Sequence, residues 1–133
     1  MPHPDHVLLD RIAAAVQELH GDALTLSRAM TPGSRPAIDA LIGNLGALIV
    51  SINAQRGPNH DALVALRHAT TALTHLVHAA EHLTERDGRA HDALTALRQV
   101  QSAARCLRLG HTDLLRARSR RPGAGAPDLR AAA

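Results

Sequence analysis

The chain contains no phenylalanine, tyrosine or tryptophan, and this absence limits the folds that it can adopt. A hydrophobic core must then be built from Leu, Ile, Val, Ala and Met. β-Sandwiches normally rely on aromatic and β-branched residues, whereas Leu and Ala favour helices and pack well in helical bundles. The hydrophobic content of 45% is ordinary for a globular protein, and 133 residues fit one domain. The composition therefore predicts an all-α fold.

Apolar residues recur at spacings of three and four in four segments, which is the pattern of amphipathic helices. The predicted helices span residues of about 5–30, 36–56, 59–86 and 89–118. Short turns that contain Pro or Gly separate them, so consecutive helices are expected to run antiparallel. We predict an antiparallel up-down-up-down four-helix bundle over residues 1–118, with a three-helix core and a detached first helix as the alternative. Residues 119–133, rich in Arg, Pro, Gly and Ala, are expected to form a flexible C-terminal tail.

Several residues predict how these helices begin, end or bend. Ser34 and Asn59 are expected to cap the second and third helices, and Gly57 suits the position just after the second. Gly21 and Gly110 fall inside helices, where Gly costs about 1 kcal/mol relative to Ala. The sequence does not decide whether the first helix kinks at Gly21, or whether the fourth helix frays or kinks after Gly110.

The third and fourth helices carry heptad-like apolar seams, which we expect to face the core. The predicted seam of the third helix is Leu66, Ala69, Leu73, Leu76, Ala80 and Leu83. The predicted seam of the fourth is Ala93, Leu97, Val100, Ala104, Leu107, His111 and Leu114.

Ten histidines are the most unusual polar feature of the chain. With the seam above, four histidines of the third helix point to solvent: His68, His75, His78 and His82. His75, His78 and His82 lie at i, i+3 and i+7, a spacing that lets neighbouring imidazoles bind a divalent metal ion. A polar surface that merely uses His is the alternative. The zinc-protease pattern His78-Ala79-Ala80-Glu81-His82 lacks a downstream Glu ligand, so it does not indicate a peptidase.

The positive charge is concentrated at the C-terminal end. All fifteen basic residues are Arg; residues 1–88 carry six Arg and nine acids, whereas residues 89–133 carry nine Arg and three acids. The candidate contacts for nucleic acid or an acidic partner are Arg105, Arg108, Arg116, Arg118, Arg120 and Arg121. No recognition helix or aromatic platform supports reading of specific bases, and a solvated helix end is the alternative.

Cys106 is the only cysteine, so an internal disulfide is excluded. Arg105 and Arg108 would lower the pKa of its thiol if it were exposed, whereas a half-buried Cys acts as a small hydrophobe. The N-terminus lacks a signal-peptide pattern, and the apolar stretch from Leu41 to Ile52 is too short to cross a bilayer. We expect a cytoplasmic protein.

The second helix has small or apolar residues opposite its main apolar face, namely Gly43, Gly46 and Val50. Such residues let another helix approach closely, in a homodimer or with a partner protein. Since no catalytic or cofactor motif is found, we expect a non-enzymatic protein without a cofactor. The leading hypothesis is protein–protein interaction or self-association. An Arg-rich nucleic-acid-associated protein and a metal-binding protein using the His stripe are the alternatives.

Overall fold

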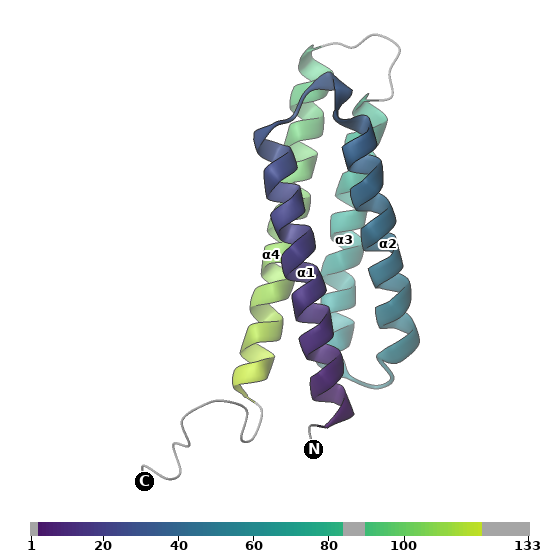
Figure 1. Ribbon diagram of the computed structural model, residues 1–133, viewed down its shortest axis with the longest axis vertical. Helices are drawn as coiled ribbons and strands as arrows, with labels where there is room; N and C mark the ends of the chain where they lie inside the picture. Colours follow the sequence, from purple (N-terminus) through teal and green to yellow (C-terminus); the bar gives the residue numbers. More distant parts are fainter. Residues whose placement is uncertain (1–2, 84–89, 121–133) are drawn as a thin grey trace.

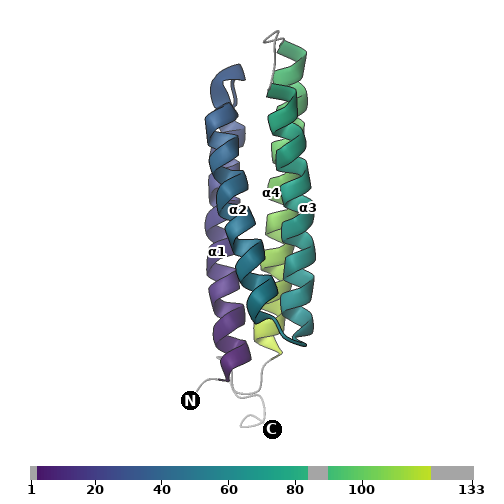
Figure 2. The ribbon, with the colours of Figure 1, turned by 90° about the vertical axis from the view of Figure 1, so that its right-hand side faces the viewer.

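The structure, a computed structural model, describes residues 3–83 and 90–120, with side chains from residue 93 in the second segment. Four α-helices form this part: α1 (Pro4–Arg28), α2 (Arg35–Gln55), α3 (His60–Leu83) and α4 (Ala90–Ser119). Consecutive helices run antiparallel, with α1 and α2 in one layer and α3 and α4 in the other (Figure 1, Figure 2). The predicted all-α up-down-up-down bundle is confirmed, and α1 is a full member that packs along α4. Residues 121–133 of the predicted tail lie outside the described residues.

The helix starts follow from local hydrogen bonds, with one difference from the prediction. The backbone N–H of Ala62 donates to Asn59 Oδ1 at 3.0 Å, so Asn59 caps α3 as expected. Ser34 does not cap α2 through its side chain. Its Oγ instead accepts a hydrogen bond from the backbone N–H of Thr31 at 2.9 Å, within a capping box around a 3-10 helix, η1 (Pro32–Ser34). The loop expected there is therefore partly helical.

Two glycines have different surroundings although both lie inside unbroken helices. Gly21 is exposed, and a Cβ added there would meet nothing within 4 Å. Gly110 is buried, and a Cβ there would lie 3.1 Å from the Cβ of His68 on α3. The question left open at Gly110 is thereby answered: α4 continues through it to Ser119, and the missing side chain allows α3 and α4 to approach closely. Gly57 has φ +50°, which confirms its place just after α2.

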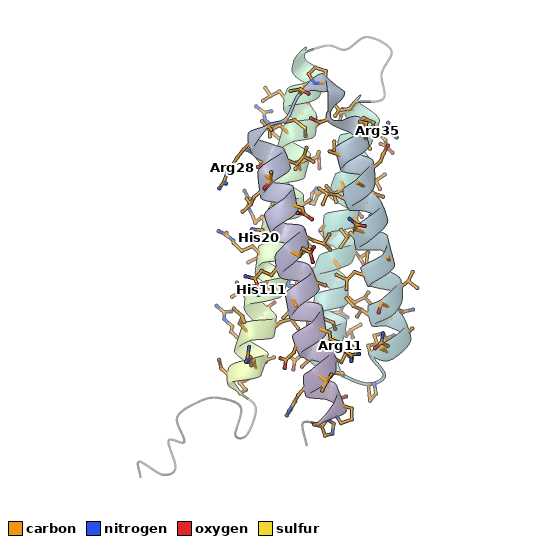
Figure 3. The ribbon with its side chains drawn as sticks, in the orientation of Figure 1. Arg11, His20, Arg28, Arg35 and His111 are labelled. Atoms are coloured by element: carbon orange, nitrogen blue, oxygen red, sulfur yellow. The ribbon has the colours of Figure 1, made fainter. Side chains whose placement is uncertain are left out.

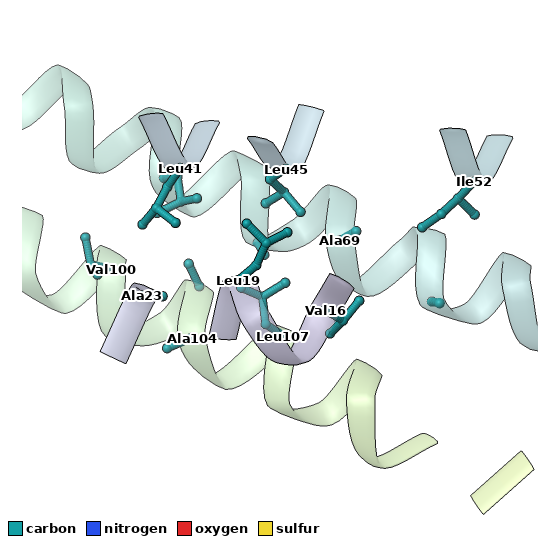
Figure 4. Close-up of a cluster of buried hydrophobic side chains, with 14 of the residues drawn as sticks. Val16, Leu19, Ala23, Leu41, Leu45, Ile52, Ala69, Val100, Ala104 and Leu107 are labelled. Carbon is teal, nitrogen blue, oxygen red and sulfur yellow. The ribbon is translucent and has the colours of Figure 1, made fainter. Parts of the chain in front are cut away.

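The core is aliphatic, and on α3 it is mostly alanine (Figure 4). The buried residues of α3 are Ala62, Ala65, Ala69, Ala72, Leu76, Ala79 and Ala80. They share Ala69, Leu76 and Ala80 with the predicted seam, but Leu66, Leu73 and Leu83 are only partly buried at its edge. The predicted seam is thus rotated. The predicted seam of α4 is corrected in the same way. Ala96, Ala103 and Gly110 are buried, whereas Leu97 and His111, which were predicted to face the core, are only half-buried.

The two glycines give opposite predictions for stability. Gly21→Ala is expected to stabilise the protein by about 1 kcal/mol, because Ala favours the helix and has free space. Gly110→Leu is expected to destabilise it by about 1–3 kcal/mol, because the new side chain must displace His68. Urea unfolding of both variants measures the difference. A Gly110→Leu protein as stable as wild type would contradict the close packing of α3 on α4.

Candidate functional site

The outward face of α2 is a strip of small apolar residues, flanked by the exposed polar residues Asn44, Ser51 and Asn53. We define it by Ala40, Gly43, Ala47, Val50 and Ala54, all of which are exposed. Val50 is 70% exposed, the highest value among the exposed large hydrophobic residues of the described chain. A Cβ added at Gly43, or at the half-buried Gly46, would meet nothing within 4 Å. Residues 40–55 contain no Asp, Glu, Lys, Arg or His. The three predicted interface residues therefore lie on an open surface.

Two recesses lie between α1 and α2, beside this face. One, of about 220 Å³, is lined by residues 8–15 of α1 and 48–55 of α2, and includes Arg11. The other, of about 550 Å³, is lined by residues 22–29 of α1, by η1 and by α2 up to Asn44, and includes Asp22. Figure 3 shows Arg11 on the side of α1 that faces α2. The outward face of α2 and the two recesses together are named the α1–α2 face.

Two of the predicted surface histidines instead face α4. His68 Nε2 lies 3.0 Å from Asp113 Oδ2, and His75 Nδ1 lies 2.7 Å from Gln99 Oε1. Both histidines are half-buried, with 28% of the His68 side chain exposed. The expectation that both point to solvent is wrong, because the rotated seam brings this side of α3 against α4.

The other two histidines of the stripe, His78 and His82, are exposed as expected. His75 therefore has a different environment from the two residues with which it was grouped. Among residues 3–83 and 93–120, no group of three or more His, Cys, Asp or Glu side chains is placed to hold a metal ion. Metal binding by His75, His78 and His82 stays a prediction.

The arginines at the end of α4 are exposed, and two of them have acidic neighbours. Arg116 lies 3.8 Å from Asp113, and Arg120 lies 3.3 Å from Asp61 on α3. Three further members of the predicted set, Arg105, Arg108 and Arg118, are exposed. Arg121 lies outside the described residues. The surface at this end is thus basic but partly neutralised, and nucleic-acid binding there stays a prediction.

Cys106 is half-buried on α4. Burial raises the pKa of its thiol, and the neighbouring Arg105 lowers it by less. The thiol is therefore protonated near neutral pH, and the activation by arginine considered for an exposed Cys106 does not occur. A small partly buried hydrophobe describes Cys106 better than a nucleophile.

His20 on α1 is a group that the sequence reasoning missed. Burial lowers the pKa of His20, and Arg108 and His111 on α4 lower it further, since nearby positive charge opposes protonation. Figure 3 shows His20 and His111 on neighbouring stretches of α1 and α4. No sequence signal connects residues so far apart, so their proximity could come only from the pairing of these two helices.

Comparisons with known proteins assign the chain to no family. No family model matches the chain, and neither the curated proteins nor the solved structures give a significant match. One helical stretch of the described residues, Pro32–Gln55, is long and apolar enough to cross a membrane by length and composition. Core helices of soluble proteins and N-terminal signal sequences meet the same test.

The lowered pKa of His20 predicts a stability that depends on pH. The unfolded chain takes up the proton near pH 6.5, whereas the bundle takes it up at lower pH. The contribution of neutral His20 to the free energy of unfolding is therefore fully present above about pH 6.5. It is lost as the pH falls through the pKa of His20 in the folded protein. When the pH is lowered from about 7.5 to about 5, the free energy of unfolding is expected to fall less in His20→Gln than in wild type.

Urea unfolding at both pH values measures this difference. Arg108→Gln is expected to act in the same direction and more weakly, because Arg108 is the second cause of the shift after burial. Equal losses in wild type and His20→Gln would contradict the prediction.

Proposed function

We propose that this chain is a soluble, non-enzymatic helical-bundle protein that works through protein–protein interaction and self-associates by its α1–α2 face. The observation that carries the proposal is the exposure of the most apolar helix. The 18-residue window of the stretch Pro32–Gln55 has a mean hydropathy of 1.6, yet only 22% of it is buried within the bundle. The partner is another copy of the chain.

The exposure of α2 is unusual for a surface helix. The solvent side of such a helix normally carries charged and polar residues, which make it amphipathic. The core side of α2 is already satisfied by four buried aliphatic residues, Ile38, Leu41, Leu45 and Ile52. Its other side still presents aliphatic surface without one charge over residues 40–55. Burying such surface in an interface stabilises by about 25 cal/mol per Å².

The chemistry of the recesses also favours binding over catalysis. Asp22 is the one ionisable residue among those that line the larger recess. General acid–base or nucleophilic catalysis needs at least two groups within hydrogen-bond reach of one reacting centre. The remaining lining is aliphatic or weakly polar, which suits the side chains of another helix.

Self-association is tested by light scattering after size exclusion, over a wide range of concentration of the full chain. Wild type is expected to form a dimer, and Val50→Glu is expected to raise its Kd by about tenfold or more, because a charge would be buried without a partner. Val77→Glu is the matched control: Val77 is 38% exposed but lies on α3, in the other layer. A wild-type protein that stays monomeric at every concentration would rule the proposal out.

A further inference from the structure

The outward side of α4 carries charge of one sign. Residues 93–119 contain a single acid, Asp113, and five arginines, all of them exposed: Arg98, Arg105, Arg108, Arg116 and Arg118. None of Arg98, Arg105 and Arg108 forms an ion pair with another described residue. The exposed side of α1, in contrast, mixes both signs, with Arg11, Glu18 and Asp22.

Three of these arginines share one line along α4 with an exposed leucine. Arg98, Arg105, Leu109 and Arg116 follow one another at intervals of seven, four and seven residues, which keeps them on one side of a helix about 27 Å long. Leu94 lies four residues before Arg98 on the same side. Leu94 is 48% exposed and Leu109 is 46% exposed. The arginine face of α4 is defined by Leu94, Arg98, Arg105, Arg108, Leu109 and Arg116.

The neighbouring helix α3 does not neutralise most of this face. His75 of α3 lies against Gln99 of α4, so the polar contact at this level is between uncharged or basic groups. The acids near α4 among the described residues of this layer are Asp61 and Asp113. Both lie toward the C-terminal end of α4, where each has an arginine neighbour. The described part of α4 up to Arg108 therefore keeps its positive charge.

The acids of α1 also lie away from the arginine face. His20 is the residue of α1 that is close enough to Arg108 for their charges to interact (Figure 3). Glu18 and Asp22 are exposed, but each is two residues from His20, which is about 200° around the helix. They are thus on the side of α1 that is turned away from α4. Asp10 lies about 15 Å from His20 along α1, toward the C-terminal end of α4.

The shape and the leucines of this face favour a flat anionic surface over a nucleic acid. α4 packs between α1 and α3, so it is part of a side of the bundle that is about 20 Å or more across (Figure 2). The major groove of B-DNA is about 12 Å wide and does not admit such a side. Exposed leucines gain nothing from a phosphate backbone, whereas at a lipid interface they are buried among hydrocarbon.

We propose that the arginine face of α4 docks on an anionic lipid surface, with its arginines at the headgroup phosphates and with Leu94 and Leu109 at the boundary of the acyl chains. The guanidinium group suits phosphate because it donates two parallel hydrogen bonds. The long aliphatic stem of Arg lies along apolar surface while its charge stays at the headgroups. This inference is independent of the proposed self-association, because α4 lies in the other layer from α2.

Co-sedimentation of the full chain with vesicles tests the role of the arginines. We expect binding to phosphatidylcholine vesicles with about one-third phosphatidylserine, and loss of this binding between about 0.05 M and about 0.5 M salt. Arg98→Gln with Arg105→Gln is expected to lower the partition coefficient about 25-fold, because each Arg near such a surface contributes about fivefold. Arg11→Gln with Arg67→Gln removes the same charge from α1 and α3, and this matched control is expected to lower it less than about twofold.

The leucines distinguish a lipid surface from other polyanions. Leu94→Gln with Leu109→Gln is expected to lower the partition coefficient about tenfold or more, because interfacial binding increases with the apolar area that is buried. Val77→Gln, which changes a 38% exposed residue on α3, is the control and is expected to have no effect. Circular dichroism checks that each variant keeps its helical content.

Three results would overturn the proposal. The first is no binding to the anionic vesicles at about 0.05 M salt. The second is equal binding to pure phosphatidylcholine vesicles, which assigns the contact to the apolar face of α2. The third is vesicle binding that the leucine substitutions leave unchanged, together with tighter binding to a random-sequence DNA duplex, which assigns the arginines to nucleic acid. Self-association is measured without vesicles, so it stands or falls separately.

Discussion

The close approach of α3 and α4 is the contact on which the other features of this bundle depend. In a chain without aromatic residues, the space between the helices must be filled by aliphatic side chains, or it must be made smaller by packing the helices closer together. Alanine occupies most buried positions of α3, and α4 also has small residues at buried positions, namely Ala96, Ala103 and Gly110. Small side chains shorten the distance between helix axes and give a well-packed pair at little cost in side-chain entropy.

This close pair determines where the larger residues go. Leu and Ile from α1 and α2 fill the centre of the bundle, against the alanine surface of α3 and α4, as Figure 4 shows for Leu19, Leu41 and Leu45. Once α1 follows α4 and α2 follows α3, the contact between α1 and α2 themselves is less filled, and the two recesses lie there. The open side of the bundle is thus a consequence of its tightest contact.

Periodicity and turn chemistry predicted the helices well, because both act locally. Asn59 and Gly57 behaved as their residue types suggest, and each helix ends within a few residues of its predicted position. The orientation of α3 about its axis was not predicted. Two heptad series, one richer in Leu and one in Ala, both fit the sequence, and hydrophobicity alone favours the former. The choice depends on the distance to α4, so the environment of His68 and His75 and the proximity of His20 to Arg108 required the tertiary structure.

The proposed dimer also agrees with the uneven charge of the chain. The arginines at the end of α4 lie in the layer away from the α1–α2 face and at the same end of the bundle as the start of α1 (Figure 1, Figure 2). An antiparallel two-fold arrangement places the basic ends of the two copies at opposite ends of the dimer, well beyond the Debye length of about 8 Å at physiological ionic strength. A parallel arrangement would bring them to the same end, where they would repel each other. Long-range charge therefore favours the antiparallel orientation.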